Sequence, residues 1–129
     1  MSFTKEVAEA IEELKLVYET ENVSATEDGE GGAYVIVKGL VIGEKYIPST
    51  IWCGFRITYM YPEAQVYPHF VNPELKRADE ANFGGGFSKD VSWNKLTTVQ
   101  ISRSSKVWKA SIDTAQLKLE KVLQWIREQ

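Results

Sequence analysis

The sequence has few of the residues on which covalent and metal chemistry depend. Cys53 is the single cysteine and His69 the single histidine among 129 residues. One cysteine cannot form an internal disulfide, and one cysteine with one histidine cannot complete a tetrahedral zinc site without further ligands. We therefore expect no disulfide, no metal site and no other cofactor.

Long apolar runs and an excess of basic charge are also missing. No apolar run approaches the roughly 20 residues that a membrane-spanning helix needs. The first residues lack the basic start and apolar centre of a signal peptide. The 15 basic and 18 acidic residues give a net charge of −3, whereas nucleic-acid-binding domains normally have a basic surplus. We expect a cytoplasmic protein that binds neither membranes nor nucleic acid.

The composition is that of a folded globular chain. Hydrophobic residues make up 43% and charged residues 26% of the sequence, in the range of ordinary soluble domains. A chain of this length can enclose one hydrophobic core. The sequence contains no internal repeat and no linker-like segment, so we expect a single domain over residues 1–129.

An amphipathic helix is predicted from about Thr4 to Glu21. Its apolar residues are three or four positions apart, as one face of a helix requires. They are Phe3, Val7, Ile11, Leu14 and Tyr18. The other face is acidic, and we interpret it as solvated surface, with a docking surface as the alternative.

Four strands are predicted after this helix, forming an antiparallel meander. They cover Val23–Glu27, Ala33–Val37, Thr50–Thr58 and Val66–Val71. Turn residues at Asp28–Gly32 join the first two strands, and residues 38–49 read as a loop. Because Pro68 cannot donate a backbone hydrogen bond, the fourth strand is predicted at an edge of the sheet.

The C-terminal third combines a long irregular segment with a second helix. Residues 76–110 contain a flexible Gly84–Gly86 run, and only Thr97–Ser102 shows the alternation of a strand. Asp113 and Gln116 resemble a capping box for a helix that reaches about Glu128. An α+β fold is therefore predicted, with an N-terminal helix, a four-stranded meander, an irregular segment and a C-terminal helix.

Few side chains are candidates for catalysis. Cys53 shares one strand face with apolar residues, so we interpret it as an inert core thiol. His69 is expected to have a surface or hydrogen-bonded structural role. The alternative is a hydrolase or transferase in which Ser92 or Ser102 works with His69, and this requires the two side chains within hydrogen-bond reach.

Two further features of the segment after residue 75 are candidates for binding. Arg103 and the lysines at 89, 95, 106 and 109 make the segment locally basic, which would attract an acidic partner but is also typical of solvated side chains. Arg103 is in addition a candidate catalytic residue. Trp93 and Trp108 are interpreted as lids over the core, with a ligand platform as the alternative.

The order of motifs resembles the ubiquitin-conjugating-enzyme (UBC) superfamily. The resemblance rests on the hairpin sequence DGEGGAYVIVKGL and the loop with Tyr46 and Pro48. It continues with the Tyr61-Pro62 corner, the run Asn72-Pro73-Glu74-Leu75, and Trp108 followed by Asp113 and a terminal helix. It covers nearly the whole chain and is greatest for a bacterial branch of the superfamily. That branch is associated with ubiquitin-like proteins, an activating enzyme and a JAB-type peptidase.

The sequence departs from the family at its catalytic positions. The acceptor cysteine of the family follows the His-Pro-Asn turn, in the segment that begins here at Lys76, and no cysteine is present there. Asn72 stands where the family has the turn histidine, and Glu74 replaces the asparagine that stabilises an oxyanion. Cys53 precedes the Tyr-Pro corner. The resemblance therefore implies a variant that cannot transfer a thioester by the usual route.

The sequence thus predicts a cysteine-less UBC-like protein that binds a ubiquitin-like protein or its activating enzyme. The alternative within the fold is an RWD-like interaction module outside any conjugation pathway. The residues expected to bind a partner are those of the motifs, the single histidine and two tryptophans of the segment after residue 75: Tyr61, Pro62, His69, Asn72, Pro73, Trp93 and Trp108.

Overall fold

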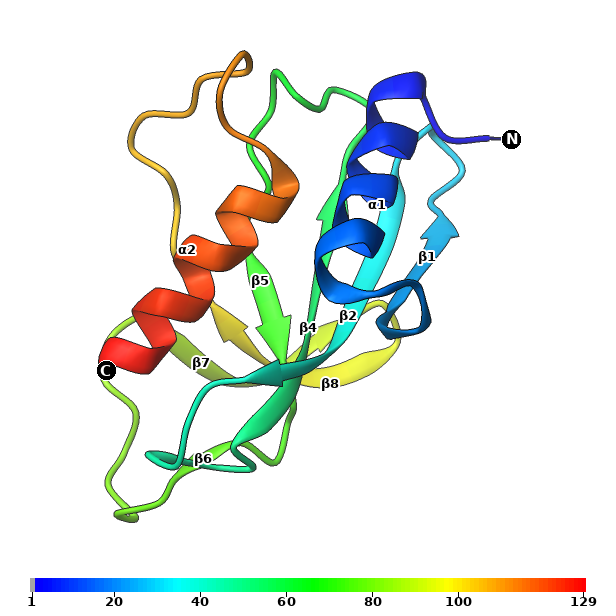
Figure 1. Ribbon diagram of the computed structural model, residues 1–129. Helices are drawn as coiled ribbons and strands as arrows, with labels where there is room; N and C mark the ends of the chain where they lie inside the picture. Colours follow the sequence, from blue (N-terminus) through cyan, green and yellow to red (C-terminus); the bar gives the residue numbers. More distant parts are fainter. Residues whose placement is uncertain (1) are drawn as a thin grey trace.

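The computed structural model describes residues 2–129 as an α+β fold. Two helices, α1 (Lys5–Tyr18) and α2 (Ala115–Glu128), pack on the same face of a six-stranded sheet (Figure 1). A short 3-10 turn, η1 (Thr20–Asn22), connects α1 to the first strand. The N-terminal helix, the antiparallel sheet and the C-terminal helix that the sequence predicts are confirmed.

The main sheet has the strand order β1-β2-β4-β5-β8-β7, and each neighbouring pair is antiparallel. Its strands are β1 (Val23–Glu27), β2 (Ala33–Val41), β4 (Thr50–Ile57), β5 (His69–Val71), β7 (Phe87–Trp93) and β8 (Leu96–Ile101). Two short strands, β3 (Tyr46–Ile47) and β6 (Lys76–Arg77), form a separate ladder. The sheet therefore has two edge strands, β1 and β7.

The first helix begins and ends at identifiable backbone features. The Thr4 side chain accepts a hydrogen bond from the Val7 N–H, which makes Thr4 the N-cap. Glu19 has a φ of +74°, a value that L-residues rarely adopt and that a helix cannot continue through. The helix accordingly ends at Tyr18, earlier than the predicted Glu21.

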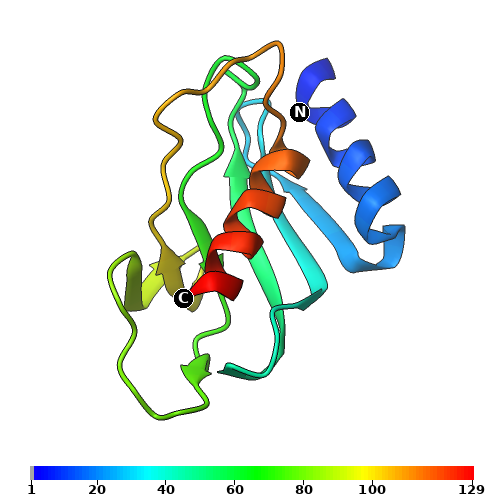
Figure 2. The same ribbon diagram turned by 60° about the vertical axis from the view of Figure 1, so that its left-hand side comes forward.

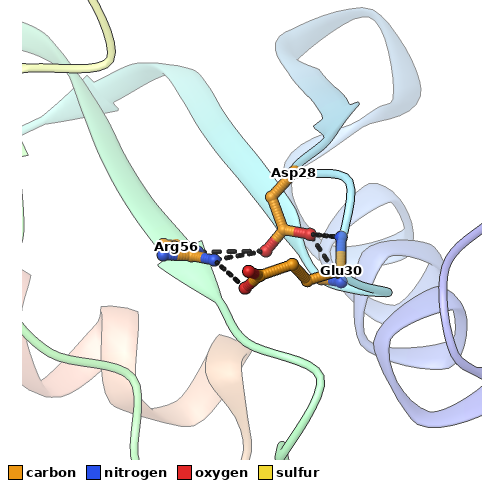
Figure 3. A network of polar contacts seen from close by, with 4 residues as sticks. Asp28, Glu30 and Arg56 are labelled. Atoms are coloured by element: carbon orange, nitrogen blue, oxygen red, sulfur yellow. Dashed lines mark hydrogen bonds and ion pairs between the residues drawn. The ribbon is translucent and has the colours of Figure 1, made fainter.

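The turn between β1 and β2 is organised by Asp28, whose side chain has no exposed surface. One carboxylate oxygen accepts hydrogen bonds from the backbone N–H groups of Glu30 and Gly32, at 2.8 and 2.9 Å. The other accepts from Arg56 Nε at 3.0 Å (Figure 3). A Cβ on Gly32 would lie 2.4 Å from the carbonyl oxygen of Ile57, so only glycine fits beside β4.

The structure corrects the predicted position of the strand that contains His69. The prediction of an edge strand over Val66–Val71 is wrong, because β5 lies between β4 and β8 inside the sheet. Pro68 precedes the three hydrogen-bonded residues of β5 and so removes no donor from the ladder. The peptide bond before Pro68 is cis.

The segment over residues 76–110 is not irregular throughout. It contributes β6 and the hairpin β7–β8, and β8 pairs with β5 through His69–Ile101 and Val71–Val99. The predicted strand at Thr97–Ser102 is therefore confirmed with shifted bounds. Residues 102–114 then run without regular secondary structure to the start of α2 (Figures 1 and 2).

The N-cap of the second helix lies one residue after the predicted cap. Thr114 is the N-cap, and its Oγ1 accepts from the Leu117 N–H at 3.1 Å. Asp113 instead accepts from the Lys109 N–H at 2.6 Å, so the predicted capping box with Gln116 is wrong. Ile112, an apolar residue that precedes Asp113, lies outside the helix and is 61% exposed.

The core lies between the sheet and the two helices. It is formed by the buried faces of α1 and α2 together with the inward side chains of β2, β4, β5 and β8. Figure 2 shows the two helices lying over the sheet. Its largest buried side chains include Tyr46, Phe55 and Leu14. Because α1 and α2 also contact each other, the two ends of the chain close one common core.

Candidate functional site

The Tyr61-Pro62 corner connects the end of β4 to the start of α2. The Tyr61 hydroxyl oxygen accepts a hydrogen bond from the Ala115 N–H at 3.1 Å, at the first turn of α2. The Trp108 indole donates to the Pro62 carbonyl oxygen at 2.7 Å. Tyr61 is buried and Trp108 packs partly buried against the core. These predicted binding residues therefore fix the corner and the segment in front of α2.

An apolar hollow lies directly beside this corner. It has a volume of about 740 Å³ and is lined by residues 59–64 together with Glu6 of α1. Tyr59 is 54% and Met60 50% exposed. Large apolar side chains with this exposure cost free energy in water unless another surface covers them. This hollow is the most apolar recess at the corner.

An acidic groove of about 210 Å³ adjoins the hollow and shares Glu6, Tyr61 and Pro62 with it. Its other carboxylates come from Glu9 and Glu13 of α1 and from Asp113 before α2. The Lys109 N–H and Lys121 keep the pKa of Asp113 below its ordinary value. The groove is therefore negatively charged at neutral pH, and the acidic face of α1 borders an apolar recess.

Asn72 and Pro73 directly follow β5, and the contacts of Asn72 are structural. The Asn72 amide oxygen accepts from the Trp52 N–H at 2.9 Å, and its nitrogen donates to Glu74 Oε1 at 3.0 Å. Asn72 is 8% exposed, whereas Pro73 is exposed. Asn72 thus joins the end of β5 to β4.

Trp93 lies on the face of the sheet opposite the helices. Its ring stacks on Phe70 with the centroids 4.8 Å apart and meets the edge of Tyr34 at 5.9 Å. A Cβ on Gly54 would lie 2.4 Å from the Trp93 ring. Trp93 therefore covers the backbone of β4 at Gly54, and the guanidinium of Arg56 extends the cluster over Tyr34 at 5.4 Å.

The single cysteine is a core residue, as the sequence predicts. Cys53 has no exposed surface and lies in the hydrophobic core. Burial raises the pKa of its thiol to about 12. Since a thiolate is the reactive form, Cys53 is protonated and shielded at neutral pH.

His69 lies in the core as well, so the expected surface or hydrogen-bonded role is wrong. Its side chain has no exposed surface, and neither ring nitrogen has a hydrogen-bond partner among residues 2–129. Its ring centroid is 5.1 Å from that of Phe55. Burial, followed by the charge of Lys118, lowers the pKa of His69 to about 3. His69 is therefore a neutral imidazole across the physiological range.

The serine candidates do not form a nucleophile–base pair with this histidine. Ser92 is exposed on β7, opposite Thr97. Ser102 follows β8, and its hydroxyl oxygen accepts from Gln100 Nε2 at 3.0 Å. Since neither nitrogen of His69 has a partner among the described residues, neither serine is hydrogen-bonded to it.

A second, basic hollow lies between the segment after β8 and α2. Arg103, Lys106, Lys118 and Lys121 contribute to its lining, together with Trp125, and its volume is about 260 Å³. Arg103 was a candidate from the sequence, but Lys118 was not. The sequence contains a sign of this role, because Lys118 falls on the same helix face as Ala115, Leu119 and Val122. An apolar residue is normal on that face.

Within residues 2–129 no group of three or more histidine, cysteine or acidic side chains is arranged to hold a metal ion. Over the same residues, neither helix has the length and apolar character needed to cross a bilayer. Comparison with family models, curated proteins and solved structures gives no match to this chain. The UBC resemblance therefore stays a prediction.

Proposed function

We propose that the chain is a UBC-like protein that binds a ubiquitin-like protein or its activating enzyme, in a bacterial modification system, without forming a thioester. The observation that carries this proposal is the apolar hollow at residues 59–64 beside the acidic groove of α1. Recesses of several hundred Å³ that combine apolar walls with a few charges are typical binding sites.

The apolar hollow and the acidic groove specify the chemistry of the partner surface. An apolar side chain of the partner would cover Tyr59 and Met60, while basic side chains would face Glu6, Glu9 and Glu13. Charge complementarity of this kind speeds association and selects the partner, whereas the apolar contact supplies most of the affinity. The order of motifs along the chain supports a ubiquitin-like protein or an activating enzyme as the source of that surface.

The position of the thiol supports the part of the proposal that excludes a thioester. A protein that accepts a ubiquitin-like tail needs an accessible thiolate, but Cys53 is fully buried with a raised pKa. The segment after residue 75, where the family has its acceptor, contains no cysteine.

The test is a binding measurement by calorimetry between this protein and ubiquitin-like and activating proteins of the same organism. We expect a complex with one of them. Met60→Ser should weaken it about tenfold or more, because a central apolar contact contributes on the order of 1 to 2 kcal/mol. Glu9→Lys should also weaken the complex, and more strongly at low salt than at high salt.

Leu16→Ser is the matched control, since Leu16 is 87% exposed on α1 and lines neither the apolar hollow nor the acidic groove. It should bind as the wild type does. Binding of neither a ubiquitin-like protein nor an activating enzyme would contradict the proposal. Formation of a reductant-sensitive adduct that Cys53→Ala abolishes would contradict its second part.

A further inference from the structure

The basic hollow between the segment after β8 and α2 is unusual in an acidic protein. The whole chain has a net charge of −3, yet four cationic side chains, Arg103, Lys106, Lys118 and Lys121, line this one recess. They come from two segments of the chain, because Arg103 and Lys106 follow β8 whereas Lys118 and Lys121 belong to α2. The positive charge is therefore assembled by folding.

Lys118 is the central observation. It is only 5% exposed, and its ammonium group donates to the Arg103 carbonyl oxygen and the Ser105 hydroxyl, both at 2.7 Å. It forms no ion pair with any carboxylate among residues 2–129. A buried charge without a counter-ion is costly and is normally paired or bound to a ligand of opposite charge.

The surroundings of Lys118 are positive rather than compensating. Burial, followed by the charges of Lys121 and Arg103, lowers its pKa to about 8, while Asp113 acts in the opposite direction. Asp113 is already paired with Lys121 at 3.5 Å. The charge of Lys118 also acts on His69, which is neutral and offers no negative charge.

The recess is held open by fixed contacts. Gln65 donates to the Ser104 hydroxyl at 3.2 Å and to the Ser105 carbonyl at 3.3 Å, and it accepts from the Ser105 N–H at 2.8 Å. Arg103 lies over the Trp125 ring at 5.0 Å. These contacts fix the segment and orient the guanidinium before any ligand arrives, which reduces the entropic cost of binding.

We propose that this basic hollow is a binding site for a phosphate group, with Lys118 at its base and Arg103, Lys106 and Lys121 around it. A dianion suits several converging cations better than a monovalent carboxylate does, and arginine and lysine are the usual phosphate-binding side chains. The volume of about 260 Å³ equals that of about nine waters of liquid. It admits inorganic phosphate or a small phosphate monoester.

The test uses the full-length protein and follows backbone and lysine resonances by NMR during titration with inorganic phosphate. We expect saturable shifts confined to residues 103–107 and 118–125, and a rise in the pKa of Lys118. Sodium chloride at matched ionic strength should not produce them. A parallel titration with glycerol phosphate identifies the source: tighter binding than inorganic phosphate assigns a monoester ligand, and weaker binding assigns free phosphate.

Two variants and one control complete the experiment. Lys118→Met retains the apolar stem and removes the buried charge, so it should fold and bind phosphate about tenfold or more weakly. Lys106→Met, at an exposed position, should also weaken binding. Lys38→Met removes one charge outside the hollow and should leave affinity unchanged. Equal shifts with chloride, or unchanged affinity in both hollow variants, would overturn the proposal.

Discussion

His69 makes the stability of the folded protein depend on pH. Its imidazole is fully buried without a hydrogen-bond partner among the described residues, and its pKa is lowered from 6.5 to about 3. The folded protein therefore keeps this side chain neutral at pH values where the unfolded chain binds a proton. By linkage, its contribution to stability is complete above about pH 6.5 and is lost progressively as the pH falls toward 3.

We predict that the free energy of unfolding falls by about 2 kcal/mol between about pH 6.5 and pH 5 because of His69 alone, at about 1.4 kcal/mol per pH unit. Urea unfolding across this range measures the change. His69→Leu removes the proton-binding group and the two unpartnered nitrogens, so it should flatten the pH profile in this window. An unchanged slope in the variant would contradict the assignment.

The sequence predicts the buried environment of Cys53 but not that of Lys118. The inert thiol was predictable, because Cys53 shares a strand face with apolar neighbours and the face is buried. The buried ammonium of Lys118 was not predicted. Its position on the apolar face of α2 is visible in the sequence, but its hydrogen-bond acceptors come from Arg103 and Ser105. No spacing rule connects those residues to a helix 13 to 15 positions away.

At the scale of elements, the β1–β2 turn depends on one carboxylate. Asp28 accepts hydrogen bonds from two turn N–H groups and from Arg56 of β4 (Figure 3). Asp28→Ala would leave the two N–H groups of the turn and the guanidinium without their acceptor. Hydrogen bonds to charged groups contribute about 1.5 to 3 kcal/mol. We predict that the substitution lowers the free energy of unfolding by about 2 to 3 kcal/mol.

Glu30→Ala is the matched control for this prediction. Glu30 also pairs with Arg56, at 3.1 Å, but its side chain is 66% exposed. An exposed pair contributes under about 1 kcal/mol, so this variant should stay close to the wild type in chemical denaturation. Equal losses from the two substitutions would show that the turn does not depend on the buried carboxylate.

Elements with a strong local pattern were predictable, and those defined by distant partners were not. The α1 stripe and the bounds of β1 follow from periodicity and turn residues in the sequence. The edge strand β7, FSKDVSW, has mostly exposed side chains, so it shows no apolar alternation. The pairing of β8 with β5 spans about 30 residues of chain, and a local pattern contains no information about it.

At the scale of the whole molecule, the N-terminal and C-terminal helices cover the same core and contact each other. α2 buries Ala115, Lys118, Leu119, Val122, Leu123 and Ile126 in or against the same core that α1 covers. Tyr18 of α1 donates a hydrogen bond to Glu120 of α2, and Tyr46 donates to the Ile126 carbonyl oxygen at 2.8 Å. The sheet alone would expose one complete apolar face.

We therefore predict that removal of residues 115–129 abolishes cooperative unfolding. The remaining chain would expose the side chains that α2 covers, and a fully buried apolar side chain contributes about 1.5 to 3 kcal/mol. Several such losses exceed the usual net stability of a domain of about 5 to 15 kcal/mol. Circular dichroism and amide-resonance dispersion measure the effect. A cooperative transition in the truncated chain would contradict it.

The two binding proposals also separate at this scale. The apolar hollow and acidic groove involve α1 and the Tyr61-Pro62 corner, whereas the basic hollow involves the segment after β8 and α2. Their lining residues do not overlap. One chain with a net charge of −3 thus presents an acidic and a basic recess, and only the pair between Asp113 of the groove and Lys121 of the basic hollow joins them, at 3.5 Å.

The register shift in the edge strand β7 has a consequence for behaviour at high concentration. Pairing with β8 is interrupted between Ser88 and Val91, and Asp90 has a φ of +58°. An exposed strand edge with unpaired N–H and C=O groups is a template on which a second molecule can add a strand and begin a polymer. The bulge breaks that template, and the charges of Lys89 and Asp90 sit at the break. Edge-to-edge aggregation is therefore disfavoured at β7 while the hairpin stays intact.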